Sequence, residues 1–145
     1  MNEEQQRGLE RGIIAFNRGE FFEAHEIWES AWLGSQGPVR DFLQGLIQVS
    51  VALHHLSRGN LHGARSLLER AAAHFEGLPS PCHGIHCEEL LLVAKRCVTL
   101  GEEMLRARNP VGKGCLTKQE WSALPLPRLD IEPRRDQAAT DDALL

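Results

Sequence analysis

Apolar residues recur every three or four positions along most of the chain, and no useful length of it alternates with a period of two. This spacing is typical of helices that bury one face. Glycine, proline and asparagine residues mark where the helices begin and end. The predicted helices span about residues 3–17, 20–33, 38–57, 60–76 and 87–108. The pattern therefore predicts an all-α fold.

A shift of forty residues aligns two parts of the sequence. Gly19 then falls on Gly59 and Ala24 on Ala64, with further apolar matches along both helices. The shared turn and helix resemble the second half of a tetratricopeptide unit. Two copies make a pair of hairpins and not a solenoid. We expect two stacked antiparallel helical hairpins that turn at these glycines, closed by the fifth helix.

The composition changes after the fifth helix. The segment "ALPLPRLDIEPRRDQAATDDALL" is rich in proline and charge. We expect a five-helix bundle domain at residues 1–108, followed by an arm and tail at residues 109–145. Leu124 to Ile131 is expected to lie on the bundle as an extended arm, and the end beyond it to be disordered.

The composition is that of an ordinary one-domain globular protein, with 145 residues, 42% of them hydrophobic, and a net charge of −4. This charge gives no reason to expect nucleic acid as a partner, and no run reaches the ~18–20 apolar residues of a membrane span. The polar start "MNEEQQRGLER" is not a signal peptide. We expect a cytoplasmic protein with reduced cysteines.

The most aromatic segment, "FNRGEFFEAHEIWESAW", also carries titratable side chains. Phe22, His25, Glu29 and Trp32 form one column of the second helix, and Glu26 lies to one side of it. Because aromatic residues bracket the histidine and the carboxylate, we expect both to be buried and paired.

The third helix supplies candidate partners. Gly45 and Ala52 are small enough for another helix to come close, which would trap Gln48 and His55 in the contact. We predict one shared polar cluster facing the second helix. Its candidate ligand-binding residues are His25, Glu26, Glu29, Arg40, Gln44, Gln48 and His55.

Three interpretations of this cluster stay open. It could be a structural network that fixes the register of the hairpins. It could be a small-molecule or catalytic pocket, in which Glu26 or Glu29 tunes His25 or His55, or in which Arg40 helps to bind an anion. It could be a divalent-metal site with His25, Glu29 and His55 as ligands. The catalytic residues and any cofactor are unknown.

A second set of candidate ligands lies in "CHGIHC". Cys82, His86 and Cys87 could contribute to a zinc site completed by Cys97, Cys115 or a second chain. Neighbouring residues rarely point at one ion, so an exposed loop is the simpler interpretation. A disulfide between Cys82 and Cys87 would form only under oxidation and would constrain little.

Two long motifs resemble a known family. They are Asn-x-Gly-Glu-aromatic-x-x-x-His-Glu-x-x-Glu-x-x-Trp, and Gln-Gly-Leu-Ile-Gln joined to His-x-x-x-Gly-Asn-x-x-Gly-Ala. From about Gly8 to Phe75 the chain is similar to a bacterial and archaeal family catalogued as domain of unknown function, number 309. The matching residues are Asn17, Gly19, Glu20, His25, Glu26, Glu29, Trp32, Gln44, Gly45, Gln48, His55, Gly59, Asn60, Gly63 and Ala64. The resemblance implies a bundle of helical hairpins and no established activity.

Two classes of function therefore stay open. One is a small-molecule or metal-assisted site at the predicted polar cluster. The other is a helical interaction module, in which the cluster is structural and an outer or concave surface binds a protein partner. Whether the protein forms a homo-oligomer is also open.

Overall fold

The computed structural model of the protein describes residues 1–109 and 114–130. These residues form α1 (Glu3–Asn17), α2 (Phe21–Leu33), α3 (Gly37–Ser57), α4 (Leu61–Phe75), α5 (Cys87–Arg108) and α6 (Lys118–Ser122). They contain no strand, only an isolated bridge between Cys82 and Ile85. The predicted all-α fold is confirmed, and all five predicted helices are present.

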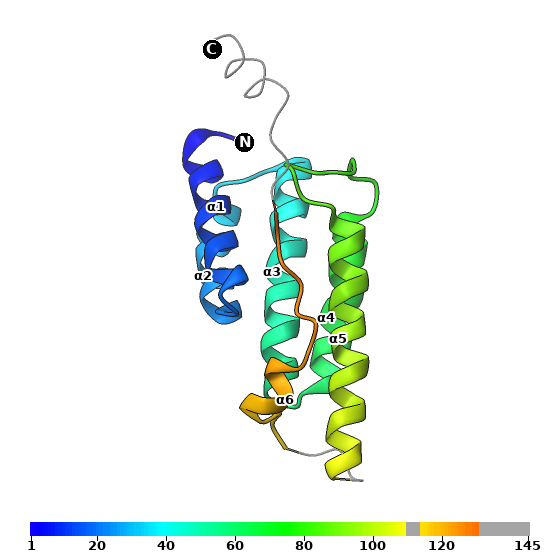
Figure 1. Ribbon diagram of the computed structural model, residues 1–145. Helices are drawn as coiled ribbons and strands as arrows, with labels where there is room; N and C mark the ends of the chain where they lie inside the picture. Colours follow the sequence, from blue (N-terminus) through cyan, green and yellow to red (C-terminus); the bar gives the residue numbers. More distant parts are fainter. Residues whose placement is uncertain (110–113, 131–145) are drawn as a thin grey trace, which may run out of the picture.

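The first four helices form the two predicted antiparallel hairpins, α1 with α2 and α3 with α4 (Figure 1). Gly19 and Gly59 take positive φ angles of 79° and 76° at the two turns. At both turns the amide after the glycine donates to the carbonyl five residues earlier, at 3.0 and 2.9 Å. This is the left-handed helix ending that glycine favours, and it repeats after forty residues.

The core lies around α3, which packs against α2, α4 and α5. Phe21, Ala24 and Trp28 of α2 are buried in this core, and Trp28 is fully inaccessible to solvent. The indole Nε1 of Trp28 donates to the carbonyl of Leu9 at 3.1 Å, which satisfies the buried ring nitrogen and ties α2 to α1. None of the described helices is long and apolar enough to cross a membrane.

The close helix approach predicted at Gly45 exists, but its partner is α4. A Cβ atom at Gly45 would lie 2.3 Å from the ring of Phe75, a residue of α4. The prediction that Gly45 lets α2 come close and so traps Gln48 and His55 is therefore wrong, because the helix next to Gly45 is α4. The physical reason is the short turn at Gly59, which folds α4 directly back against α3.

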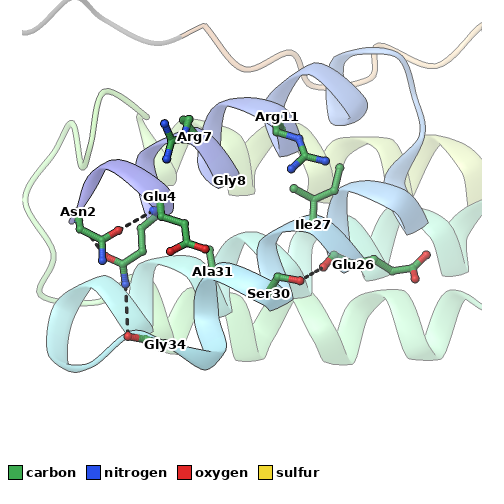
Figure 2. A pocket seen from close by; sticks show the side chains of 11 residues that line it. Asn2, Glu4, Arg7, Gly8, Arg11, Glu26, Ile27, Ser30, Ala31 and Gly34 are labelled. Atoms are coloured by element: carbon green, nitrogen blue, oxygen red, sulfur yellow. Dashed lines mark hydrogen bonds between the residues drawn. The ribbon is translucent and has the colours of Figure 1, made fainter.

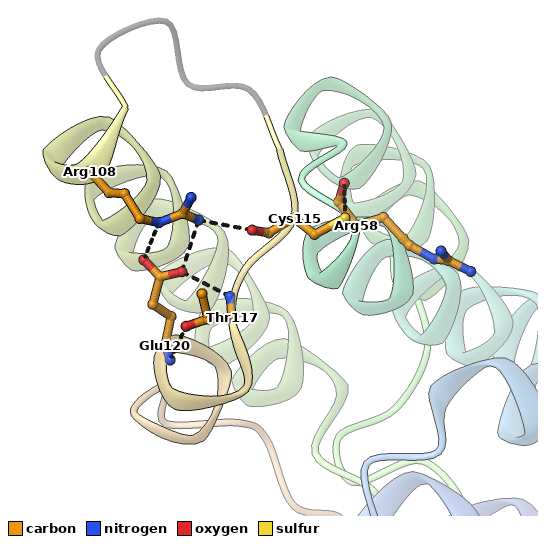
Figure 3. Close-up of polar contacts among 5 residues, drawn as sticks. All are labelled: Arg58, Arg108, Cys115, Thr117 and Glu120. Atoms are coloured by element: carbon orange, nitrogen blue, oxygen red, sulfur yellow. Dashed lines mark hydrogen bonds and ion pairs between the residues drawn. The ribbon is translucent and has the colours of Figure 1, made fainter.

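A short helix, α6, lies where the sequence indicated only an arm. Thr117 and Glu120 form a reciprocal capping box at its start. The guanidinium of Arg108 donates to both oxygens of Glu120, at 3.0 and 3.3 Å, and to the carbonyl of Cys115 at 2.9 Å (Figure 3). This guanidinium lowers the pKa of the Glu120 carboxyl. These contacts hold α6 against the end of α5.

Beyond α6 the chain is extended. Residues 123–130, which we call the arm, run back along the bundle from α6 and contact Cys97 of α5 and Asn17 of α1 (Figure 1). The ring of Trp121, just before the arm, contacts Phe21 of α2 edge to face, with centroids 6.0 Å apart. The end that was predicted to be disordered lies outside the described residues.

Candidate functional site

His25 and Glu29 form the pair that the sequence predicted, but His25 is only half-buried and Glu29 is exposed. His25 Nε2 is 3.2 Å from a carboxylate oxygen of Glu29, and His25 Nδ1 is 3.0 Å from the carbonyl of Phe22. The side chains of His25 and Glu29 are 20% and 49% exposed. The predicted burial of Glu29 is therefore wrong. Both ring nitrogens of His25 therefore lie within hydrogen-bond distance of an oxygen atom.

Glu29 is exposed because it lies on a side of α2 that does not point into the core. Phe21, Ala24 and Trp28 point into the core, so the next column around the helix reaches only the edge of the α2–α3 contact. Phe22, in that column, stays 50% exposed. Its ring lies 5.1 Å from the ring of His25 and 5.3 Å from that of His54, a residue of α3.

His54 is a histidine that the sequence did not single out. Burial lowers the pKa of His54, and the nearby charges of Arg58, His55 and His25 lower it further. Of the two adjacent histidines at the end of α3, the prediction named His55, whereas the packing shows that His54 is the one that lies against Phe22 of α2.

The other predicted residues do not join one network. The guanidinium of Arg40 lies 4.0 Å above the ring of Trp32 and donates to the carbonyl of Ser35 at 3.3 Å. His55 Nδ1 lies 3.2 Å from the side-chain nitrogen of Asn60 at the α3–α4 turn. Gln44 is half-buried and Glu26 is exposed. The predicted cluster is thus divided into separate contacts along α2 and α3.

Gln48 is the buried member of the predicted set. It is 7% exposed, and its Oε1 atom has no hydrogen-bond partner in the described part of the protein. A buried acceptor without a partner costs free energy, so Gln48 is a position where a ligand donor or a water molecule would be stabilising.

Neither predicted metal set is assembled. Among the residues that the structure describes, no group of three or more His, Cys, Asp or Glu side chains is placed to hold a metal ion. Cys82 and Cys87 are buried free thiols. Burial raises the pKa of the Cys87 thiol to about 12, so it stays protonated at neutral pH and is a poor metal ligand.

The most specific polar contact in the described residues involves the arm. The side-chain amide of Asn17, the last residue of α1, donates through Nδ2 to the carbonyl of Leu129 at 2.9 Å. Its Oδ1 accepts from the amide of the same residue at 2.8 Å. One side chain therefore satisfies both backbone groups of one arm residue, as a neighbouring strand would do.

The arm is also held by α5 and by its own apolar side chains. The Cys97 thiol donates to the carbonyl of Pro125 at 3.3 Å, and burial raises the pKa of this thiol to about 11. Leu124 and Leu129 are 6% and 5% exposed, and Pro127 is buried. We call the surface of α1 and α5 that the arm covers, with Asn17 and Cys97 as its polar contacts, the arm-binding surface.

The sequence identified Asn17 as a motif residue but did not indicate what it binds. The leucines and prolines of "ALPLPRLD" were a signal for a segment that packs on the bundle. These residues do not indicate which helices the segment reaches, because that depends on the path of the chain through α6.

Comparison with known proteins agrees with the hairpin architecture. Residues 9–67 match the family model described as "Domain of unknown function (DUF309)". A crystal structure of a conserved hypothetical protein from Thermus thermophilus is 36% identical to the chain, with a TM-score of 0.53. That alignment covers 62% of this chain and 94% of the solved one. The chain belongs to the DUF309 family.

An uncharacterized protein of Aquifex aeolicus (strain VF5) is 30% identical to this DUF309 chain over 83 residues. The match covers 57% of this chain and 25% of that protein. The family model spans both hairpin turns and Asn17. None of these relatives carries a described activity.

Proposed function

We propose that this DUF309 protein is an interaction module that binds an extended peptide segment on its arm-binding surface. Leucine and proline side chains of such a segment pack against the helical bundle beside α5, and Asn17 at the end of α1 binds its backbone. The arm is the segment that occupies this surface within the chain.

The paired hydrogen bonds from Asn17 to Leu129 carry this proposal. Contacts to backbone atoms bind an extended segment whatever its side chains, while buried side chains of the segment supply specificity. The absence of a three-ligand cluster among the described residues, together with the exposure of Glu29, favours binding over metal-assisted chemistry.

The test uses a labelled peptide with the sequence of residues 121–130. The full chain should bind it weakly, because its own arm competes at high effective concentration. Leu129→Asp places a charge at a buried position, which should release the arm and tighten peptide binding at least tenfold. A peptide carrying aspartate at the Leu129 position is the matched control and should not bind.

Adding Asn17→Ala to the Leu129→Asp chain should weaken binding again, since the backbone contact is lost. Circular dichroism of each variant verifies that the helices are intact. Equal binding by the unmodified and Leu129→Asp chains, or no binding by either, would contradict the proposal.

A second candidate is a small-molecule site beside Gln48, favoured by its unpartnered Oε1 atom. A ligand there would donate a hydrogen bond to this oxygen. Such a ligand would raise the melting temperature of the unmodified chain but not that of a Gln48→Met variant.

A further inference from the structure

The arm does not fill the space between itself and the start of α5. A cavity of about 340 Å³ remains there, with the arm on one side and the start of α5 on the other. Its lining consists of residues 126–130 of the arm and of Ile85, His86, Glu89, Leu90 and Val93. An apolar cavity of roughly 150 Å³ is large enough to bind benzene. The space beside the arm therefore has room for an aromatic ring.

The α5 side of this cavity combines apolar side chains with a free carboxylate. Ile85 and Leu90 are 2% and 4% exposed, and Val93 is half-buried. Glu89 is exposed and forms no salt bridge among the described residues. An aromatic side chain suits such a place, because its face is apolar and its edge carries partial positive charge. The indole of tryptophan adds an N–H group that can donate to a carboxylate.

Leu126 is the arm residue through which a larger side chain can enter the cavity. Of the apolar arm residues that line it, Pro127 and Leu129 are already buried, and Asn17 holds the backbone of Leu129. Leu126 also lines the cavity but is only half-buried. A ring at its position can therefore fill the cavity while the contacts of Leu129 are kept.

We propose that the partner segment of the arm-binding surface carries an aromatic residue, tryptophan above all, at the position that Leu126 occupies in the arm. This inference rests on the proposed function. A partner competes with an arm that is tethered to the surface and thus present at high effective concentration. To displace it at a lower concentration, the partner needs a contact that the arm lacks, and the cavity offers one. The arm is then a weaker occupant that covers the surface until such a segment replaces it.

The test compares labelled peptides of residues 121–130 on the Leu129→Asp chain, whose own arm is released. Replacing Leu126 by tryptophan in the peptide should tighten binding roughly fivefold, because the ring buries apolar area that leucine leaves exposed. Replacing Leu124 by tryptophan is the matched control. Leu124 is 6% exposed and does not line the cavity, so that peptide should bind more weakly than the unmodified one.

Filling the cavity from the α5 side should remove the gain. With Val93→Phe added to the chain, the tryptophan peptide should bind no more tightly than the unmodified peptide. Ile27→Phe is the matched control, since Ile27 is equally half-buried but lines a different cavity, of about 650 Å³ between α1 and α2 (Figure 2). No arm residue lines that cavity, so Ile27→Phe should leave the fivefold gain intact.

The same substitution can be made in the arm itself. Leu126→Trp in the otherwise unmodified chain should raise the melting temperature and should weaken binding of the unmodified peptide roughly fivefold, because the arm then competes better.

Two failures are distinguishable. If the unmodified peptide binds the Leu129→Asp chain but the tryptophan peptide binds no more tightly, this inference is wrong and the proposed function stands. If neither peptide binds, both are wrong. A gain that persists in the Val93→Phe chain would show that the ring does not lie in the cavity, and would also overturn the inference.

Discussion

At the scale of single residues, Asn17 and Gln48 look alike in the sequence, but the structure gives their polar atoms different surroundings. Asn17 satisfies both backbone groups of Leu129, whereas the Oε1 atom of Gln48 is buried and has no partner among the residues that the structure describes. Both residues belong to the family motif. Asn17 therefore has a defined contact to test, and Gln48 has an unmet hydrogen bond.

Replacing Gln48 by methionine should stabilise the protein in the absence of any ligand. The two side chains are similar in size, and the variant removes a buried acceptor whose desolvation is not compensated, worth about 1 kcal/mol. Urea unfolding measures the gain. Gln44→Met, at a half-buried position one turn earlier, is the matched control and should change stability by less than about 0.5 kcal/mol. A loss of stability in Gln48→Met would mean that Oε1 has a partner.

At the scale of helices, the pattern of apolar residues was sufficient to predict the five long helices and both glycine turns. Periodicity reports which face of a helix is buried, and glycine reports where the backbone must turn. Neither signal reports which neighbouring helix covers a buried face. For this reason Gly45 was assigned to the wrong partner helix, and Glu29 was expected to be buried.

The start of α6 could have been found in the sequence. "TKQE" is a capping box, and Thr117 and Glu120 form both of its hydrogen bonds. The helix that follows is only five residues long, too short for a periodic signal. The candidate site was harder to predict, because the contact between Asn17 and Leu129 joins residues 112 positions apart.

Gly45→Ala tests the packing of α3 on α4. The new methyl group would lie 2.3 Å from the ring of Phe75, so we expect destabilisation of about 1–3 kcal/mol, reduced by the better helix propensity of alanine. Gly34→Ala, where nothing lies within 4 Å, should be close to neutral. Thermal and urea unfolding give both values. If Gly45→Ala were as stable as Gly34→Ala, the approach of α4 to α3 would be looser than described.

At the scale of the whole molecule, the arm joins elements from both ends of the sequence. It extends from α6, which is held to α5 through Arg108 and Glu120, to Asn17 at the end of α1. It covers apolar surface that the helices leave open, and it does so with few long-range hydrogen bonds. The proposed function requires that this segment can be exchanged for another one of similar chemistry without unfolding the hairpins.

The most direct measurement is a double-mutant cycle between Asn17 and the backbone amide that it binds. The peptide of residues 121–130 is prepared with and without an N-methyl group on the residue corresponding to Leu129. Both peptides are titrated against the Leu129→Asp chain, with Asn17 intact or replaced by alanine. N-methylation removes one hydrogen-bond donor and should weaken binding to the Asn17 chain roughly fivefold, the equivalent of about 1 kcal/mol.

In the Asn17→Ala chain the same methyl group should lower the affinity little, because the side chain that would accept the amide's hydrogen bond is already absent. Equal affinity of the two peptides for the Asn17 chain, or an equal loss in both chains, would contradict backbone recognition by Asn17.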